Sequence, residues 1–147
     1  MTLSRRALFR GMLTVAATAG VCGPDRMPTA LAQTTLNPEA ALQQLMDGNR
    51  RFAEGRMTSF AEDLELLKAK TAEGQEPFAA VLSCADSRVP VELIFDQTIG
   101  HIFVTRVAGN IATSAVIASL EYGAAVLGTR VIVVLGHANC EIGRAHV

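Results

Sequence analysis

Three short runs of hydrophobic residues stand out along the chain and indicate buried strands. They cover residues 78–82, 102–104 and 131–135, and none contains the alternating polar residues of a half-exposed strand. Continuous apolar runs are typical of strands that are covered on both faces, as in parallel sheets. We therefore predict three strands, each buried on both faces.

Helical spacing of hydrophobic residues precedes the first run. Asn37 and Pro38 suit the N-cap and the first turn of a helix, and hydrophobic residues then recur every three or four positions until about Gly55. The predicted apolar face of this helix comprises Leu42, Leu45, Met46, Asn49 and Phe52. A second helix is predicted over residues 60–70.

Helices are also predicted between the strands, over residues 89–95 and 112–127. The order strand, helix, strand, helix, strand is typical of an α/β domain with a central parallel sheet flanked by helices. A length of 147 residues suits one such domain, which we place at residues 33–140.

Composition and charge exclude one class of partner. Half of the residues are hydrophobic, 18% are charged and the formal net charge is −1, which fits a folded domain with a buried core. The body of the chain has no cluster of Lys and Arg, and the sequence has no Trp and one Tyr. A nucleic acid partner is therefore not expected, since phosphate binding and base stacking need those residues.

The first 32 residues have the features of a targeting segment. Arg5 and Arg6 form a twin-arginine pair, a modestly apolar stretch covers residues 11–23, and Ala30 and Ala32 form an Ala-x-Ala cleavage signal. We predict a twin-arginine signal peptide over residues 1–32 and export of the remainder to the periplasm. The apolar stretch is too short for a stable membrane span. The alternative is a cytosolic N-terminus in which the two arginines are adjacent by chance.

Two polar clusters follow the first and the third predicted strands. Cys84, Asp86 and Arg88 come after the first strand, and His137 and Cys140 come after the third. Open parallel sheets build their functional sites beyond the carboxyl ends of their strands. The two clusters meet there if the first and third strands are neighbours.

The residue types in these clusters suit zinc. A catalytic zinc site has three protein ligands and an open fourth position, and Cys84, His137 and Cys140 offer three ligands of the preferred kinds. Either cluster alone is a weak indication, but the pair, each after a predicted strand, predicts a Zn²⁺ site. The alternative is that the two cysteines form a disulfide or are inert thiols.

The clusters resemble the hallmark motifs of the β-class carbonic anhydrases, Cys-x-Asp-x-Arg and His-x-x-Cys. The resemblance extends over about residues 37–140 and includes residues 103–110, which are similar to the second-strand segment of that family. It implies zinc-dependent, reversible hydration of carbon dioxide to bicarbonate and a proton. It also implies a homodimer or higher homo-oligomer formed through the N-terminal helices.

The resemblance further implies roles for individual residues. Asp86 would orient the attacking water, or bind zinc as a fourth ligand in a resting form, and Arg88 would hold Asp86 in its ionised state. The implied substrate-binding residues are Gln75, Phe103 and Tyr122, and the implied supporting backbone is Gly109 and Asn110.

Two other functions stay open at this point. One is hydrolysis of carbonyl sulfide or carbon disulfide at the same site, and the other is a non-catalytic zinc-binding or thiol-redox domain. Residues 141–147 do not continue the family pattern, so we predict a C-terminally truncated domain with a non-native tail. The last ligand would then lie close to a chain end, and we expect this chain to bind zinc weakly and to have little activity.

Overall fold

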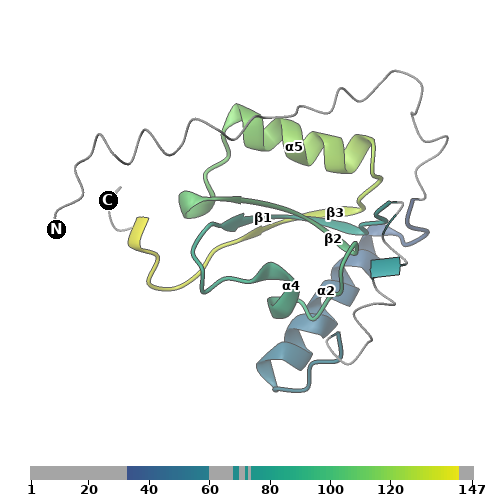
Figure 1. Ribbon diagram of the computed structural model, residues 1–147, viewed down its shortest axis with the longest axis horizontal. Coiled ribbons are helices and arrows are strands. Elements are labelled where there is room, and N and C mark those ends of the chain that lie inside the picture. The colour runs from purple at the N-terminus through teal and green to yellow at the C-terminus, as the bar shows by residue number, and fades with distance from the viewer. Residues whose placement is uncertain (1–32, 60–67, 70–71, 73, 143–147) are drawn as a thin grey trace, which may run out of the picture.

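The computed structural model describes residues 33–59, 68–69, 72 and 74–142, and within them an α/β domain with a parallel sheet (Figure 1). The predicted signal peptide, residues 143–147 and most of the predicted helix at residues 60–70 lie outside the described residues. Among the helices that the structure describes, none is both long and apolar enough to cross a bilayer.

The sheet has three parallel strands in the order β2-β1-β3. β1 (Ala79–Cys84) is central, with β2 (Ile102–Val107) on one side and β3 (Val131–Leu135) on the other. The three predicted strands and their parallel arrangement are thus confirmed. Ser83 pairs with Leu135, so the carboxyl ends of β1 and β3 lie side by side.

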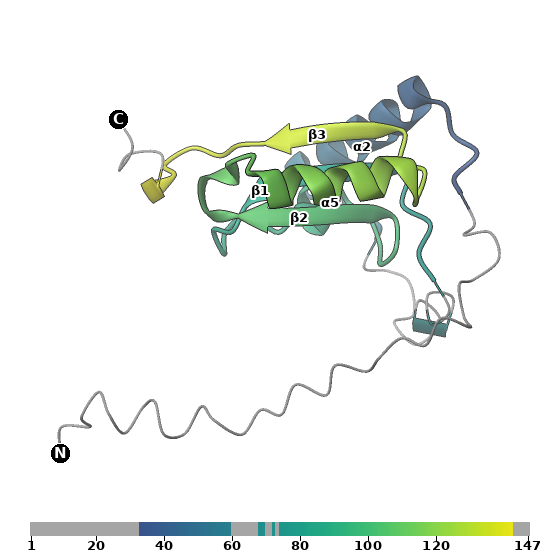
Figure 2. The ribbon, with the colours of Figure 1, turned by 90° about the horizontal axis from the view of Figure 1, so that it is seen from above.

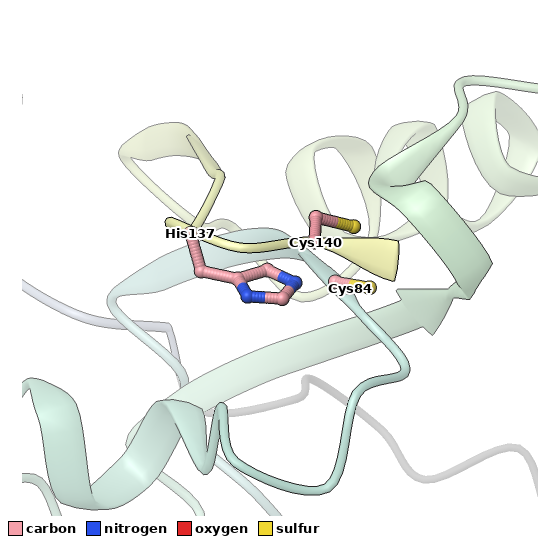
Figure 3. A group of neighbouring side chains, drawn as sticks. All are labelled: Cys84, His137 and Cys140. Atoms are coloured by element: carbon pink, nitrogen blue, oxygen red, sulfur yellow. The ribbon is translucent and has the colours of Figure 1, made fainter. Parts of the chain in front are cut away.

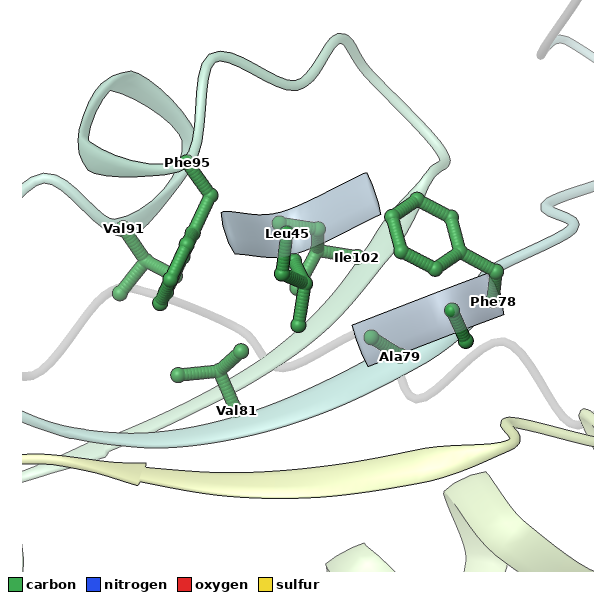
Figure 4. Packing of buried hydrophobic residues seen from close by; sticks show 8 residues of the cluster. Leu45, Phe78, Ala79, Val81, Val91, Phe95 and Ile102 are labelled. Atoms are coloured by element: carbon green, nitrogen blue, oxygen red, sulfur yellow. The ribbon is translucent and has the colours of Figure 1, made fainter. Parts of the chain in front are cut away.

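Helices cover the two faces of the sheet. α2 (Pro38–Ala53) and α4 (Val91–Ile94) lie on one face and α5 (Ser114–Ala125) lies on the other, as Figures 1 and 2 show. The core beneath α2 and α4 contains Ala41, Leu45, Phe78, Ala79, Val81, Val91, Phe95 and Ile102 (Figure 4). The core beneath α5 contains Ala80, Leu82, Val116 and Leu120. Every residue of β1 is buried because both of its faces are covered.

Side-chain caps fix where the two long helices begin. The side chain of Asn37 accepts a hydrogen bond from the backbone N–H of Ala40 at 2.8 Å, as the sequence predicts. The hydroxyl of Thr113 accepts one from the N–H of Val116 at 3.5 Å and caps α5 in the same way. These bonds satisfy backbone donors that have no partner inside the helix.

The face that α2 turns toward the sheet differs from the prediction. Leu45 is buried as expected, but the buried face also contains Ala41 and Gly48. Three residues of the predicted apolar face are exposed instead: Leu42, Met46 and Phe52. Gly48 explains the difference, because a Cβ at this position would overlap the carbonyl group of Phe95. The helix therefore approaches the core along its small residues.

β3 is less covered than predicted. Its residues alternate in exposure, and Ile132 and Val134 are 48% and 62% exposed. They pair with Ala80 and Leu82, which belong to the core beneath α5, so they lie on the α5 face. α5 packs over β1 and β2 (Figure 2), which leaves this face of β3 open within the part of the chain described. The prediction that all three strands are buried on both faces is therefore correct for β1 and wrong for β3, and it is also wrong for β2, in which Ile102 alone is buried.

A buried carboxylate that the sequence pattern did not single out ties α2 to the loop after α4. The side chain of Asp96 is fully buried and forms an ion pair with Arg51. It also accepts hydrogen bonds from the backbone N–H groups of Thr58 and Ser59, each at 2.9 Å. Burial raises the pKa of this carboxyl, but the hydrogen bonds from Ser59, Arg51 and Thr58 outweigh burial and hold the pKa well below its usual range.

Candidate metal centre

The two polar clusters meet at the carboxyl ends of β1 and β3. One ligand atom from each of Cys84, His137 and Cys140 lies within 4.8 Å of the other two (Figure 3). Cys84 is the last residue of β1, and the other two residues lie on the turn that follows β3. The structure therefore brings together the three residues that the sequence analysis selected as ligands.

Backbone amides hold the sulfur of Cys84 in place. The N–H of Asp86 donates to Sγ at 3.4 Å and the N–H of Gly109 donates to it at 3.3 Å. Gly109 lies in a short 3-10 helix, η1 (Ala108–Asn110), which follows β2. Its φ of 70° is one that glycine adopts without strain. Gly109 thus contacts the sulfur of Cys84, and the supporting role of Gly109 and Asn110 stays a prediction.

Hydrogen bonds to its sulfur lower the pKa of Cys84 and so favour the thiolate form. The N–H of Asp86 contributes most, followed by the side chain of His137 and the N–H of Gly109, and burial acts in the opposite direction. Together they lower the pKa of Cys84 to about 7. Because the thiolate is the form that binds metal, protons compete less strongly with a metal ion at this sulfur.

One ring nitrogen of His137 is available to bind a metal ion. Its Nδ1 lies 3.1 Å from the carbonyl oxygen of Ala138, while its Nε2 is buried without a hydrogen-bond partner among the described residues. A buried polar atom without a partner is costly. A metal ion would remove this cost, and two thiolates with a neutral imidazole form a donor set that Zn²⁺ favours. The residues present therefore fit the metal.

Asp86 and Arg88 form the ion pair that the sequence analysis predicts. Arg88 donates from Nε to Oδ1 at 2.9 Å and from Nη2 to Oδ2 at 2.6 Å, and its backbone N–H also donates to Oδ1. These bonds hold the pKa of Asp86 well below its usual range and raise the pKa of Arg88. Oδ2 of Asp86 lies 3.9 Å from Nε2 of His137, so the carboxylate borders the three ligands.

Arg106 is a site residue that the sequence analysis missed. It lies near the end of β2 and donates from Nε to the carbonyl oxygen of Cys84 at 3.0 Å. Its Nη2 donates to the carbonyl oxygen of Asp86. A charged residue inside the apolar segment 102–107, on the strand expected next to the ligand-bearing strand, was the available signal.

A cavity of about 300 Å³ opens beside the ligands. It is lined by Cys84, Ala85, Asp86, Ser87, Arg88, Cys140, Glu141 and Ile142. A metal ion and a small substrate both fit a space of this volume.

The predicted substrate-binding residues do not line this cavity within one copy of the chain. Gln75 is exposed in the segment before β1, at the opposite end of that strand from Cys84. Phe103 and Tyr122 contact each other with ring centroids 6.3 Å apart. Phe103 pairs with Ala80, four residues before Cys84 along β1. Their roles in substrate binding stay predictions.

Comparison with known proteins is consistent with this site. The family model described as carbonic anhydrase matches residues 79–147. Carbonic anhydrase 2 of Mycobacterium tuberculosis is 47% identical over 104 residues, which cover 71% of this chain and 50% of the relative. The carbonic anhydrase of Mycolicibacterium smegmatis is 44% identical over 109 residues, which cover 74% of this chain and 52% of the relative.

Solved structures share the fold. The β-carbonic anhydrase CcaA matches with a TM-score of 0.51 and 33% identity, over 68% of this chain and 50% of that one. A tetrameric β-carbonic anhydrase of Sordaria macrospora matches with a TM-score of 0.52 and 29% identity, over 73% of this chain and 53% of that one. The chain belongs to the β-class carbonic anhydrase family. It spans about half the length of the curated relatives it matches.

Proposed function

We propose that the protein catalyses the reversible hydration of carbon dioxide to bicarbonate and a proton at a Zn²⁺ site formed by Cys84, His137 and Cys140. The observation that supports this most strongly is the convergence of two thiols and an unpaired imidazole nitrogen beside a carboxylate held by an arginine. The named activity of the relatives agrees with it.

Zinc bound there would supply Lewis-acid chemistry, which lowers the pKa of water to about 7 and makes a nucleophile available at neutral pH. The chain itself supplies the charge balance. Two thiolates and a neutral imidazole offset the charge of a divalent ion, and the amides of Asp86 and Gly109 lower the pKa of Cys84 and so favour its thiolate form.

Asp86 is placed to orient the reaction. Its pKa lies well below the usual range, so it accepts hydrogen bonds at every pH at which the enzyme would work. Arg88 fixes the plane of the carboxylate by binding both oxygens. A water molecule that donates to Asp86 would have a lone pair directed at the carbon of carbon dioxide. Arg88 also keeps Asp86 from taking up the released proton.

We also propose that the protein is an exported homo-oligomer. The tetrameric state of the related Sordaria macrospora enzymes supports self-association. The exposed side chains of Leu42 and Met46 on α2 offer an apolar surface for it, in keeping with the prediction that the N-terminal helices form the contact. Export rests on the twin-arginine and Ala-x-Ala signals of the first 32 residues.

Zinc titration of the chain, combined with stopped-flow hydration at saturating zinc, tests the proposed function. We expect at most one Zn²⁺ per chain, bound weakly, and a low hydration rate that a chelator abolishes. Cys84→Ser and Cys140→Ser should each weaken zinc binding by more than the roughly 10–100-fold typical of residues that only contact a ligand. Cys22→Ser is the matched control, since Cys22 lies in the predicted signal peptide.

Zinc affinity that stays unchanged in Cys84→Ser would contradict the ligand assignment. Zinc binding without hydration would favour the non-catalytic alternative. A rate with carbonyl sulfide that exceeds the rate with carbon dioxide would favour the sulfur substrate.

A further inference from the structure

We propose that Arg106 is a positioning residue of the metal centre, which fixes the thiolate of Cys84 relative to the carboxylate of Asp86. It does so by binding the backbone carbonyl oxygens of these two residues. The inference rests on the proposed function, because it concerns how the residues of the proposed zinc site are held in place. It requires no contact between Arg106 and the metal or the substrate.

The register of the sheet places Arg106 where it can reach both carbonyls. It pairs with Ser83, one residue before the end of β1. Val107, which pairs with Cys84, accepts a hydrogen bond from the N–H of Ala85 at 3.1 Å and closes the ladder. Beyond this point the chain leaves the sheet, so the carbonyls of Cys84 and Asp86 take partners from outside the ladder. Each has one local donor, the hydroxyl of Ser83 at 3.4 Å for Cys84 and the N–H of Val89 at 3.1 Å for Asp86. The guanidinium of Arg106 adds a second, charged donor to each and joins the two carbonyls through one group.

The two bonds constrain the spacing of the reactive groups. Nε and Nη2 lie on one edge of a rigid planar group, so the two carbonyl oxygens that they bind are held at a fixed separation. Those carbonyls belong to the residues that carry the ligand sulfur and the orienting carboxylate. Each carbonyl carbon is bonded to the Cα atom that bears the reactive side chain, so holding the two carbonyls limits how far those Cα atoms can move. Arg106 thus restrains both side chains through the backbone that bears them.

Arg88 and Arg106 have complementary tasks. Arg88 binds the carboxylate of Asp86 and sets its orientation about the side-chain bonds. Arg106 binds the main chain on either side of Ala85 and sets the position from which that carboxylate extends. Neither arginine can replace the other, because Nε and Nη2 of Arg88 bind the two carboxylate oxygens of Asp86, whereas Nε and Nη2 of Arg106 bind two backbone carbonyl oxygens.

Cobalt substitution of the full chain tests this role, because the thiolate-to-cobalt absorption band reports the geometry of the ligands. We expect Arg106→Ala to shift this band and to weaken metal binding by about tenfold or more. Added guanidinium ion, far below denaturing concentrations, should restore part of the band, and methylammonium should not. Arg130→Ala is the matched control: Arg130 also binds a backbone carbonyl, that of Thr34 at 3.0 Å, but before β3. It should leave the band unchanged.

Two further measurements guard against ambiguous results. If Arg106→Ala fails to fold, Arg106→Lys retains the aliphatic stem and the charge but lacks the planar pair of donors, and its band should still be shifted. Hydrogen exchange of the amides of Ala85 and Asp86 in metal-free protein should accelerate in the Arg106 variants and not in Arg130→Ala. If the wild-type chain binds no cobalt, the proposed function is refuted, and hydrogen exchange of the Ala85 and Asp86 amides still decides the role of Arg106. If Arg106→Lys leaves both the cobalt band and the exchange rates unchanged, the proposed role of Arg106 is overturned.

Discussion

Nη2 of Arg88 lies 2.6 Å from Oδ2 of Asp86 and also donates to the carbonyl oxygen of Asn139 at 3.4 Å. One guanidinium therefore bridges the loop after β1 and the turn after β3. Asn139 lies between the two ligands of that turn and has a positive φ of 55°. The same side chain that orients the carboxylate thus also contacts the turn that carries His137 and Cys140.

Replacement of Asp86 should separate metal binding from turnover. We expect Asp86→Asn to keep zinc affinity within a few-fold of wild type and to lose hydration activity by about 100-fold or more, since an amide cannot act as the same acceptor. Zinc titration and stopped-flow hydration at saturating zinc measure the two effects. Asp47→Asn, at an exposed position on α2, is the control. Undiminished turnover in Asp86→Asn would refute the assigned role.

Gly109→Ala should disturb the metal centre as well as the fold. Gly109 and Gly55 have φ values of 70° and 67°, so alanine at either position costs about 1 kcal/mol or somewhat more of stability. Of the two glycines, Gly109 alone donates to Cys84, and a Cβ on it would lie 3.1 Å from the side chain of Ile142, so we expect Gly109→Ala to weaken zinc binding also. Gly55→Ala isolates the backbone cost, because no atom lies within 4 Å of the added Cβ. Equal zinc affinity in the two variants would count against the role of this amide.

Asp96 should make the fold sensitive to acid. Its pKa is lowered in the folded state, so its contribution to stability is complete above the unfolded value of about 3.9 and is lost as the pH falls toward the folded value. Asp96→Asn should lower the free energy of unfolding at pH 7 by about 1–3 kcal/mol, because buried donors lose their partner. Below about pH 4 the difference from wild type should shrink.

Urea unfolding at several pH values measures this dependence. The control is Asp47→Asn, which removes an exposed ion pair with Arg50 and should change stability by less than about 1 kcal/mol at every pH. A loss of stability in Asp96→Asn that is the same at pH 3 and pH 7 would show that the charge of Asp96 contributes little.

The twin-arginine prediction has a direct test. Arg5→Lys combined with Arg6→Lys keeps the charge of the segment but removes the pair, and should retain the protein inside the cell as an uncleaved precursor. Cell fractionation and the mass of the mature protein measure this, with Gln33 expected as the first residue after cleavage. Arg26→Lys, in the same segment, should have no effect. Normal export of the double variant would contradict this route.

Much of the fold could be predicted because β1 and the helix caps follow local rules. A continuous apolar run, an Asn-Pro helix start and polar residues after the strands need no knowledge of distant contacts. The set of metal ligands could be predicted for the same reason, since Cys84 lies at the carboxyl end of one strand and His137 and Cys140 follow another.

The incorrect or missing predictions concern residues whose burial or hydrogen-bond partners are set by tertiary contacts. Leu42 and Met46 have the spacing of a buried face but are exposed. The face of α2 that contains Gly48 is buried instead, because only glycine fits against the carbonyl group of Phe95. Arg106 could not be assigned from spacing, because its partners are carbonyl groups on a neighbouring strand. Asp96 is likewise defined by donors that lie nearly forty residues away in the sequence.

The division of the ligands between β1 and β3 has a consequence for folding. A metal ion that joins Cys84 to Cys140 would close a loop of 56 residues. The loop-closure relation for a cross-link of that length gives about 4 kcal/mol from restriction of the unfolded chain. Metal would thus link β3 to β1, the central strand of the three that the structure describes. Depletion of zinc should then loosen β3 first, so that metal supply and the lifetime of the folded domain become linked.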